Sequence, residues 1–436
     1  MNVKHKNFLV YGMSVSGEWV AKLLAKKKAN VFLFDDDHQT LKNKTIKDCY
    51  VLPELNENFI LQFDYIVVSP SIEKDNEYLK IAREGNIKIF SEVEFASMFC
   101  KKYVAVTGTN GKTTTVKIIE QLLTTKYKAK ACGNIGYPVS RAVLDNKRAI
   151  KVIEVSSFML ENCETFSPHI ATITNITSDH LTRHKTIEEY SRLKQSIYKN
   201  LKSNDYAVVN LDENLCEKSN CLTLTYSYNH LADVCVRNDA IYLHNQKVVS
   251  LSDLKLKGKH NVYNIMCAIC FAYIYKIKID KIRNVLINLR TEKFRIEHIA
   301  SISKIKFVND SKSTNQASTL SAVDTVRGAI ILILGGSNKN LNYEKMFQHM
   351  SKRVKEVVVY GEIANQLILD NKNKFTIKKF ENLKQSFEYA CSVAIANDTI
   401  LLSPATASYD QYENYIERGN EFNRLVEEYA NKTKKK

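Results

Sequence analysis

The chain has 436 residues, of which 44% are hydrophobic and 25% charged, a composition that excludes a disordered, collagen-like or mucin-like protein. The formal net charge of +16 comes mainly from scattered lysines, whereas readers of nucleic-acid sequence rely on arginine, so we expect no nucleic-acid partner. The sequence contains no apolar run of about 18 residues, so we expect no membrane span. The start of the chain lacks the features of a secretory signal. We therefore expect a cytoplasmic protein with about two to four domains. We also expect a monomer.

The first part of the chain alternates strand-like and helix-like segments. The strand-like segments cover 7–12, 31–35 and 65–71, and the helix-like segments cover 17–28 and 76–84. Strands that alternate with helices build a parallel sheet. The segment SEVEF, which begins at Ser91, then leads into a second block.

The second block opens with YVAVTGTNGKTTT (103–115), which predicts a strand, a glycine loop and a helix that ends near residue 125. Further strands are expected at 150–155, 169–175 and 206–210, short strands within 221–250, and helices at 186–200, 260–275 and 280–289. The helix expected at 260–275 is strongly apolar.

A third series of strands and helices begins near residue 292. Its strands are KIKFVND (304–310), AIILILGG (329–336), EVVVYG (356–361) and TILLSP (399–404), and its last helix is expected at about 410–430. The sequence thus predicts an α/β fold class with mostly parallel sheets. The expected domains cover residues 1–92, 93–291 and 292–436.

The segment Gly108–Thr113 lies between a strand and a helix, in a chain that has only 13 glycines. Amide N–H groups at a helix N-terminus attract phosphate, Lys112 can reach the β- and γ-phosphates, and the Thr113 hydroxyl can ligate Mg²⁺. The generic phosphate-loop pattern would place a glycine at Val106, so this loop is a shorter variant.

Glu154 ends the hydrophobic segment IKVIE, about 40 residues after the glycine loop. An acidic residue at the end of a buried strand is suited to hold Mg²⁺, directly or through water. The ten cysteines are dispersed, and the lone pair Cys267 and Cys270 lies in a helical pattern. We expect reduced, partly buried thiols rather than a zinc site.

Nine segments, read in order, resemble the Mur ligases, which are ATP-dependent amide-forming ligases of peptidoglycan synthesis. These segments are GTNGKTTT (108–115), CGNIGYP (132–138), EVSSF (154–158), ITSDHLTRH (176–184), GKHNVYN (258–264), FRIE (294–297), NDSKSTN (309–315), LGGSNK (334–339) and SPATASYDQYENYIERGNEF (403–422). The last of them looks most like the member of the family that adds D-glutamate.

The resemblance implies a Rossmann-like domain for the UDP group, a central phosphate-loop ATPase domain and a Rossmann-like C-terminal domain for the amino acid. ATP would phosphorylate the L-alanyl carboxylate of UDP-N-acetylmuramoyl-L-alanine, and the D-glutamate amine would attack the acyl phosphate. A Mur ligase that adds another amino acid, a basic ATPase that binds nucleic acid and a catalytically silent nucleotide-binding scaffold remain as alternatives.

The resemblance also implies roles for individual residues. The expected ATP contacts are Gly108, Thr109, Asn110, Gly111, Lys112, Thr113, Thr114, Asn261, Asn264, Arg295 and Asp310, and the expected Mg²⁺ ligands are Thr113, Glu154, His180 and a carbamylated Lys194. The expected catalytic residues are Lys112, His180, Lys194 and Lys312. The expected UDP-substrate contacts are Val15, Ser16, Asp35, Ser69, Asn134 and Ser156, and the expected D-glutamate contacts are Thr314, Lys339, Ser408 and Tyr415.

Some positions depart from the family or carry a weaker expectation. Ser71 stands where the family commonly has glycine, and the acidic run Asp35–Asp37 would repel a diphosphate unless some of its side chains turn outward. Met159 replaces a glutamine of many relatives, and His184 is expected to be a surface histidine. The short connection at 290–293 is the expected hinge of the third domain.

Overall fold

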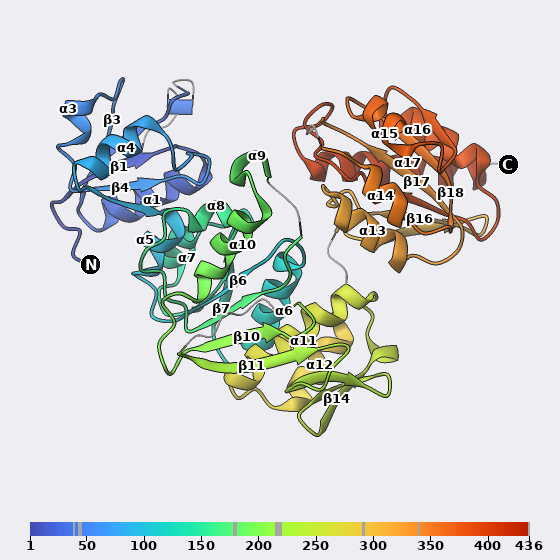
Figure 1. Ribbon diagram of the computed structural model, residues 1–436, viewed down its shortest axis with the longest axis horizontal. Helices are drawn as coiled ribbons and strands as arrows, with labels where there is room; N and C mark the ends of the chain where they lie inside the picture. Colours follow the sequence, from blue (N-terminus) through green and yellow to red (C-terminus); the bar gives the residue numbers. More distant parts are fainter. Residues whose placement is uncertain are drawn as a thin grey trace. The chain divides into compact units, whose positions relative to one another are not determined.

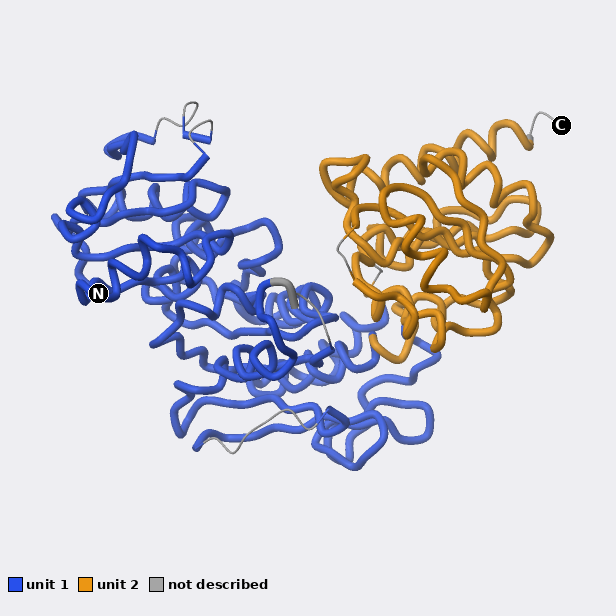
Figure 2. Tube along the Cα trace, turned by 45° about the horizontal axis from the view of Figure 1, so that its top comes forward, with its two compact units in different colours: residues 1–254, 261–288 blue, residues 255–260, 289–436 orange. Residues whose placement is uncertain are grey.

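The computed structural model describes residues 1–37, 40–41, 46–177, 181–213, 220–289, 293–338 and 341–434. The chain forms two compact units (Figure 2). The first contains residues 1–254 and 261–288, and the second contains 255–260 and 289–436. The domain boundaries expected at 92 and 291 stay predictions, and residues 290–292 of the expected hinge lie outside the described residues.

The first unit begins with a five-stranded parallel sheet in the order β3-β2-β1-β4-β5 (Figure 1). The strands are β1 (Asn7–Tyr11), β2 (Asn30–Phe34), β3 (Cys49–Val51), β4 (Tyr65–Val68) and β5 (Lys88–Ser91). The helices are α1 (Val15–Lys26), α3 (Glu57–Ile60), α4 (Glu77–Glu84) and α5 (Glu92–Ser97). The strand order reverses between β1 and β4, so a ligand-binding crevice is expected at their carboxyl ends.

Alternating residues of β1 face two separate cores of this sheet. Phe8 and Val10 pack with α1, whereas Leu9 and Tyr11 pack with α3 and α4. Both faces of the sheet are therefore covered by helices, which is why its strands are continuously apolar.

A nine-stranded sheet follows, in the order β14-β13-β12-β11-β10-β9-β6-β8-β7. Its strands are β6 (Tyr103–Thr107), β7 (Ala129–Gly133), β8 (Ile150–Glu154), β9 (Ile170–Ile173), β10 (Tyr206–Asn210), β11 (Leu222–Ser227), β12 (Val234–Arg237), β13 (Ala240–Leu243) and β14 (Gln246–Ser250). The strands from β7 to β12 pair in parallel, and β12, β13 and β14 form an antiparallel end.

The helical elements of this part are α6 (Lys112–Thr124), α7 (Val139–Asp145), α8 (Ser157–Leu160), α9 (Leu181–His184), α10 (Ile187–Gln195), η1 (Ser196–Tyr198), η2 (Leu251–Asp253), α11 (Lys259–Ile274) and α12 (Ile279–Asn288). The strongly apolar helix expected at 260–275 corresponds to α11, in which an unbroken run of residues from Ile265 to Ala272 is buried.

The second unit is built on a six-stranded sheet in the order β15-β16-β20-β17-β18-β19. Its strands are β15 (Glu297–Ile302), β16 (Ile305–Asn309), β17 (Ile330–Gly335), β18 (Val354–Tyr360), β19 (Ile377–Lys379) and β20 (Thr399–Leu402). The edge strand β15 is antiparallel, and the other pairs are parallel. The predicted α/β class with mostly parallel sheets is therefore confirmed.

Helices cover both faces of this third sheet. Leu332 and Leu334 of β17 pack in a core with α13 (Gln316–Thr325), α14 (Glu344–His349) and α15 (Ala364–Asn371). Ile331 and Ile333 pack in a core with α16 (Leu383–Val393) and α17 (Tyr415–Lys434).

The last helix begins later than the expected residue 410. Asn414 Oδ1 accepts hydrogen bonds from the N–H groups of Ile416, at 2.9 Å, and Glu417, at 3.1 Å. This capping interaction satisfies N–H groups of the first helical turn and explains why α17 begins at Tyr415.

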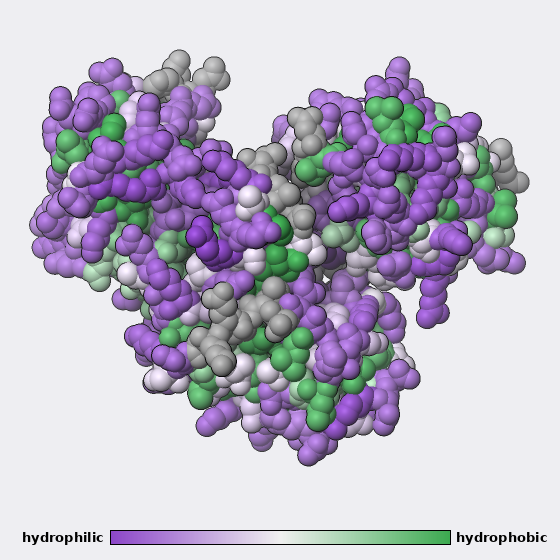
Figure 3. All heavy atoms as spheres, in the orientation of Figure 1, coloured by the Kyte–Doolittle hydropathy of each residue, from purple (hydrophilic) through white to green (hydrophobic). Residues whose placement is uncertain are grey.

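None of the described helices is long and apolar enough to cross a membrane. Hydrophilic residues dominate the face in Figure 3, as expected of a lysine-rich chain. The described cysteines are free, and burial raises the pKa of the Cys267 thiol to about 12. The described residues contain no cluster of His, Cys, Asp or Glu suited to a metal.

Candidate active site

The predicted phosphate loop lies between β6 and α6, and two of its residues have backbone conformations that require glycine. Gly108 has φ +141°, and a Cβ atom there would lie 2.0 Å from Thr174 Oγ1. Gly111 caps α6 with φ +82°, and its Cβ would lie 2.3 Å from Asn264 Oδ1. A side chain at either position would collide with Thr174 or Asn264 beside the loop.

Two predicted catalytic lysines meet at this loop. Lys112 Nζ donates to the carbonyl oxygens of Gly108, at 2.9 Å, and Thr109, at 2.7 Å. Lys194 Nζ, from α10, donates to the same Gly108 oxygen at 2.8 Å. Lys194 is only 1% exposed and lies 4.5 Å from the ring centre of Tyr190. The structure therefore gathers at one loop two cations that are far apart in the sequence.

The segment that follows β9 holds the loop in place. Thr109 Oγ1 accepts a hydrogen bond from the Thr177 N–H at 3.0 Å and lies 3.2 Å from the Tyr190 hydroxyl. The Asn110 N–H donates to Asn175 Oδ1 at 2.9 Å. Because these protein contacts hold the loop, its backbone is preorganised for binding.

Oxygen atoms suited to Mg²⁺ lie beside the loop. Glu154 ends β8, is paired in register with Val106 of β6, and is 3% exposed. Asn134 Nδ2 lies 3.4 Å from Glu154 Oε1. Thr113 is the second residue of α6, so a hydroxyl and a carboxylate are available for a hard cation. The predicted ligand His180 lies outside the described residues.

Other predicted ATP contacts also lie in the first unit. Thr114 Oγ1 is buried and has no hydrogen-bond partner within the described part of the chain. Asn264, in α11, accepts a hydrogen bond from Thr115 Oγ1 at 3.2 Å and donates to Asn261 Oδ1 at 3.3 Å. These two buried asparagines therefore support the helix that follows the phosphate loop.

The predicted UDP contacts of the first sheet gather at its topological switch point. Ser14 Oγ lies 2.8 Å from Ser69 Oγ and 3.3 Å from Ser16 Oγ. Asp35 accepts a hydrogen bond from the Met13 N–H at 2.6 Å. The predicted contact Val15 begins α1 and is 58% exposed.

Two of the three side chains of the acidic run Asp35–Asp37 are exposed. The Asp36 carboxylate accepts a hydrogen bond from the Tyr11 hydroxyl at 2.8 Å, while Asp36 and Asp37 are exposed. The Ser71 hydroxyl, at the position where the family often has glycine, lies 3.3 Å from Ser69 Oγ. The two predicted contacts of the nine-stranded sheet, Asn134 and Ser156, lie at the ends of β7 and β8.

The second unit holds a separate group of predicted residues after β16 and β20. Asp310 is buried and accepts hydrogen bonds from Ser403 Oγ, at 2.7 Å, and the Ile296 N–H, at 3.1 Å. Burial raises the pKa of its carboxyl to about 6. Lys312 Nζ lies 6.0 Å from the ring centre of Tyr415, at the start of α17.

The remaining predicted residues of this unit differ in exposure. Ser408 is 2% exposed, Arg295 and Thr314 are half-buried, and Lys339 lies outside the described residues.

Sequence reasoning missed Arg418, which is fully buried in the second unit. Its guanidinium donates to the Ser311 hydroxyl and to backbone carbonyls at the end of β17 and in the segments that follow β16 and β20. These hydrogen bonds reach Ser311 Oγ at 3.0 Å, Ser311 O at 2.9 Å, Thr406 O at 3.1 Å, Gly335 O at 3.2 Å and Ala407 O at 3.3 Å. One side chain thus holds together the loops that carry the predicted D-glutamate contacts.

The expectation of a surface position for His184 is wrong. This side chain is 2% exposed, its Nε2 lies 2.9 Å from Ser157 Oγ, and its Nδ1 lies 3.7 Å from Glu161 Oε1. The polar sequence around it predicts exposure. Ser157 and Glu161, however, supply polar partners that offset the free-energy cost of burying the imidazole.

Three family models match the chain. They are the Mur ligase MurD-like N-terminal domain over residues 6–91, the Mur ligase middle domain over 106–272 and the Mur ligase glutamate ligase domain over 294–406.

Curated relatives match over nearly their whole length. The chain is 33% identical to UDP-N-acetylmuramoylalanine–D-glutamate ligase of Caldanaerobacter subterraneus over 446 residues, which cover 98% of this chain and 99% of the relative. It is 35% identical to the ligase of the same name from Caldicellulosiruptor bescii over 456 residues, which cover 99% and 98%.

Solved structures share the fold at lower identity. A pseudomurein peptide ligase type C from Methanothermus fervidus has a TM-score of 0.62 at 19% identity and covers 97% of this chain and 100% of its own. The MurF ligase from Thermotoga maritima in complex with ADP has a TM-score of 0.62 at 17% identity and covers 98% and 96%.

Proposed function

The chain belongs to the Mur ligase family, and from this premise we propose that it is an ATP-dependent ligase that joins D-glutamate to UDP-N-acetylmuramoyl-L-alanine. This reaction is a step of peptidoglycan precursor synthesis. We place it in the cytoplasm, with small-molecule partners, no nucleic acid and a monomeric enzyme.

The observation that carries the proposal is the convergence of Lys112 and Lys194 on the Gly108 carbonyl of a preorganised phosphate loop. In the proposed reaction the loop N–H groups and the Lys112 ammonium bind the phosphates of ATP. They stabilise the negative charge that develops as the γ-phosphoryl group moves to the L-alanyl carboxylate. The amine of D-glutamate then attacks the acyl phosphate, phosphate leaves, and an amide bond forms.

We propose that the Thr113 hydroxyl, the Glu154 carboxylate and His180 hold Mg²⁺. The metal neutralises phosphate charge when it is bound, and the hydroxyl and carboxylate beside the loop fit its preference for oxygen. We also propose that Lys194 is carbamylated. Carbamylation needs a deprotonated amine, and the burial of Lys194 favours that form. A carbamate retains one N–H that can donate to Gly108 O and adds an anion for the metal.

For the amino acid, the second unit supplies the chemistry that a dicarboxylate needs. Lys312 is a cation close to Tyr415, and Ser408 and Thr314 add hydroxyl groups. We propose that Thr314, Ser408, Tyr415 and Lys339 bind D-glutamate and that Lys312 is a catalytic residue beside them. Arg295 and Asp310 are the proposed phosphate and ribose contacts of the same unit.

Phosphate release tests the proposed function. With Mg²⁺ and ATP, release is expected only when UDP-N-acetylmuramoyl-L-alanine and D-glutamate are both present. Equal turnover with L-lysine would favour a Mur ligase with another amino acid. Release stimulated by an oligonucleotide, and weakened steeply by salt, would favour the nucleic-acid-binding ATPase instead.

A further inference from the structure

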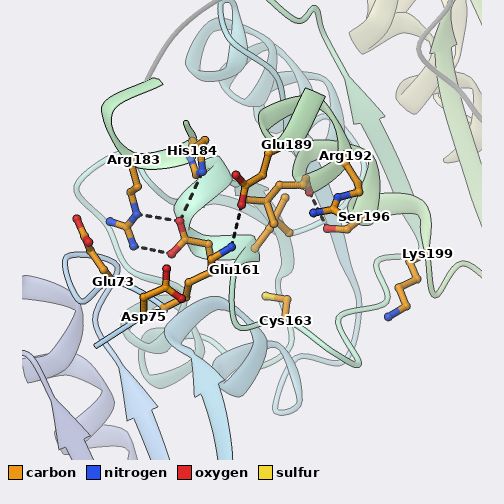
Figure 4. Close-up of a pocket in the computed structure, with 13 residues that line it drawn as sticks. Glu73, Asp75, Glu161, Cys163, Arg183, His184, Glu189, Arg192, Ser196 and Lys199 are labelled. Atoms are coloured by element: carbon orange, nitrogen blue, oxygen red, sulfur yellow. Dashed lines mark hydrogen bonds and ion pairs between the residues drawn. The ribbon is translucent and has the colours of Figure 1, made fainter. Parts of the chain in front are cut away.

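Arg183 of α9 forms a bidentate ion pair with Glu161, which follows α8 (Figure 4). Its Nε donates to Glu161 Oε1 at 2.8 Å, and its Nη2 donates to Oε2 at 2.6 Å. The Glu161 side chain is 4% exposed and the Arg183 side chain 18%. Paired in this way, the guanidinium has one fixed orientation beside α8.

The same guanidinium also binds the turn that follows β4 of the five-stranded sheet. Nη1 donates to Pro70 O at 2.8 Å, and Nη2 donates to Ile72 O at 3.1 Å. The turn has its own internal support, because the Ser69 N–H donates to Tyr11 O at 2.8 Å and Ser69 Oγ lies 2.8 Å from Ser14 Oγ. Arg183 therefore fixes the position of the turn relative to the nine-stranded sheet rather than its internal shape.

The contacts continue from Glu161 toward the proposed phosphoryl-transfer site. Glu161 Oε1 lies 3.7 Å from His184 Nδ1, and His184 Nε2 lies 2.9 Å from Ser157 Oγ. Ser157 begins α8, three residues after Glu154. A series of polar contacts thus joins the turn at Ser69–Ile72 to the start of α8, three residues after the end of β8.

We propose that Arg183 is a positioning residue that sets the distance between the UDP-binding turn and the phosphoryl-transfer site. This inference rests on the proposed function. The proposed substrate is anchored by its UDP group at the first sheet and reacts at its L-alanyl carboxylate beside the second. Freedom between the two sheets would therefore misplace the carboxylate, and misplacement by about 1 Å can cost about 100-fold in rate.

A second ion pair crosses the same junction and serves as a matched comparison. Lys74 Nζ lies 2.8 Å from Glu189 Oε1, but the two side chains are 47% and 27% exposed. Both pairs line one pocket of about 290 Å³ (Figure 4). An exposed single contact contributes about 0–1 kcal/mol, so the Lys74 pair should not hold the junction in one geometry.

The test uses three variants of the full chain: Arg183→Met, Lys74→Met, and the double variant Arg183→Met with Glu161→Gln, which leaves no unpaired buried carboxylate. In both Arg183 variants, kcat/KM for UDP-N-acetylmuramoyl-L-alanine should fall by about 10- to 100-fold, mainly through kcat. The KM values of ATP and D-glutamate, and the affinity for UDP alone, should change by less than about threefold, because none of these ligands bridges the two sheets. Lys74→Met should behave as the wild type.

A substrate truncated to N-acetylmuramoyl-L-alanine removes the anchor. Its slower turnover should be equal in the wild type and Arg183→Met, because a rigid junction helps only a substrate held at both ends. The positioning role would be overturned if Arg183→Met lost the same factor of kcat/KM with the truncated substrate as with the full one. It would also be overturned if kcat/KM for the full substrate were unchanged in Arg183→Met.

A measurement without substrates separates this inference from the proposed function. Spin labels carried by non-natural amino acids at the exposed residues Tyr50 of β3 and Leu222 of β11 report the distance between the two sheets. The distance distribution should broaden in Arg183→Met and not in Lys74→Met. An unchanged distribution overturns the inference even if the enzyme is a D-glutamate ligase. A wild type without ligase activity overturns the proposed function, and broadening would then still show that Arg183 holds the junction.

Discussion

Lys112 and Lys194 donate hydrogen bonds to the same carbonyl oxygen, that of Gly108, at 2.9 and 2.8 Å. The two side chains therefore lie against the same point of the phosphate loop. Lys194 is the buried partner, and Lys112 begins the helix at the phosphate loop. This arrangement is compatible with the proposed division of roles, in which Lys112 binds phosphate and Lys194 carries the proposed carbamate.

Replacement of Lys112 by alanine should remove amide synthesis while the fold is retained. The variant loses a charge aimed at the transferring phosphoryl group, and loss of one such donor costs about 100- to 1,000-fold in kcat. Lys117→Ala, on the exposed face of the same helix, is the control and should stay within about twofold of the wild type. Steady-state phosphate release and circular dichroism would measure activity and fold, and near-normal activity of Lys112→Ala would refute the assignment of the loop.

Replacement of Lys194 by alanine should give an inactive enzyme that a short carboxylic acid partly rescues. The substitution empties space beside Gly108 O, and a small carboxylate there could replace the anion of the carbamate. Lys199→Ala is the control, because this exposed lysine lies on the same segment. Activity would be titrated with acetate and with chloride at equal ionic strength. Equal rescue by chloride would show an effect of ionic strength alone.

Features set by local sequence could be predicted, and features set by distant backbone could not. The strand, glycine loop and helix around Lys112 follow from adjacent residues, as does the alternation that builds parallel sheets. Arg418 escaped prediction because most of its partners are backbone carbonyls of three segments, and no side-chain pattern marks such acceptors. His184 was misjudged for a related reason, since its neighbours in sequence are polar but its partners are Ser157 and Glu161.

Replacement of Arg418 by methionine should weaken D-glutamate binding and destabilise the second unit. The variant removes the guanidinium donor from backbone carbonyls such as those of Gly335 and Thr406, and a buried acceptor that loses its partner costs about 1–3 kcal/mol. KM for D-glutamate should rise by about tenfold or more, which corresponds to about 1.4 kcal/mol, while KM for UDP-N-acetylmuramoyl-L-alanine stays unchanged.

Arg424→Met is the matched control for Arg418→Met. Arg424 lies on the same helix and its side chain is 52% exposed, so its surface ion pairs should contribute about 0–1 kcal/mol. Guanidinium ion at millimolar concentration should partly restore the D-glutamate KM of Arg418→Met. A parallel rise in the KM of both substrates, without rescue, would indicate a general loss of structure instead of loop positioning.

The second unit should show two opposing effects of pH on stability. Burial raises the pKa of Asp310 to about 6, so protonation of this carboxyl favours the folded state. Its contribution is complete below about pH 4, the ordinary range of an aspartate, and is lost as the pH rises through about 6. Burial, with a smaller effect of Arg295, lowers the pKa of His260 to about 4. The stability associated with neutral His260 is therefore present above about pH 6.5 and is lost as the pH falls through about 4.

Single variants should reveal effects that nearly cancel in the wild type. Each shift of about two pH units corresponds to about 3 kcal/mol, as an order of magnitude. Relative to Asp310→Asn, the wild type should lose stability as the pH rises from 4 to 6, and relative to His260→Gln it should lose stability as the pH falls from 6.5 to 4. Native-state hydrogen exchange of the amides of β17, corrected for intrinsic rates, would follow this unit, because the single tryptophan, Trp19, lies in α1 of the first unit. If the exchange free energies of both variants changed with pH in the same way as those of the wild type, both assignments would be contradicted. A side chain that is not coupled to folding leaves the pH dependence of unfolding unchanged.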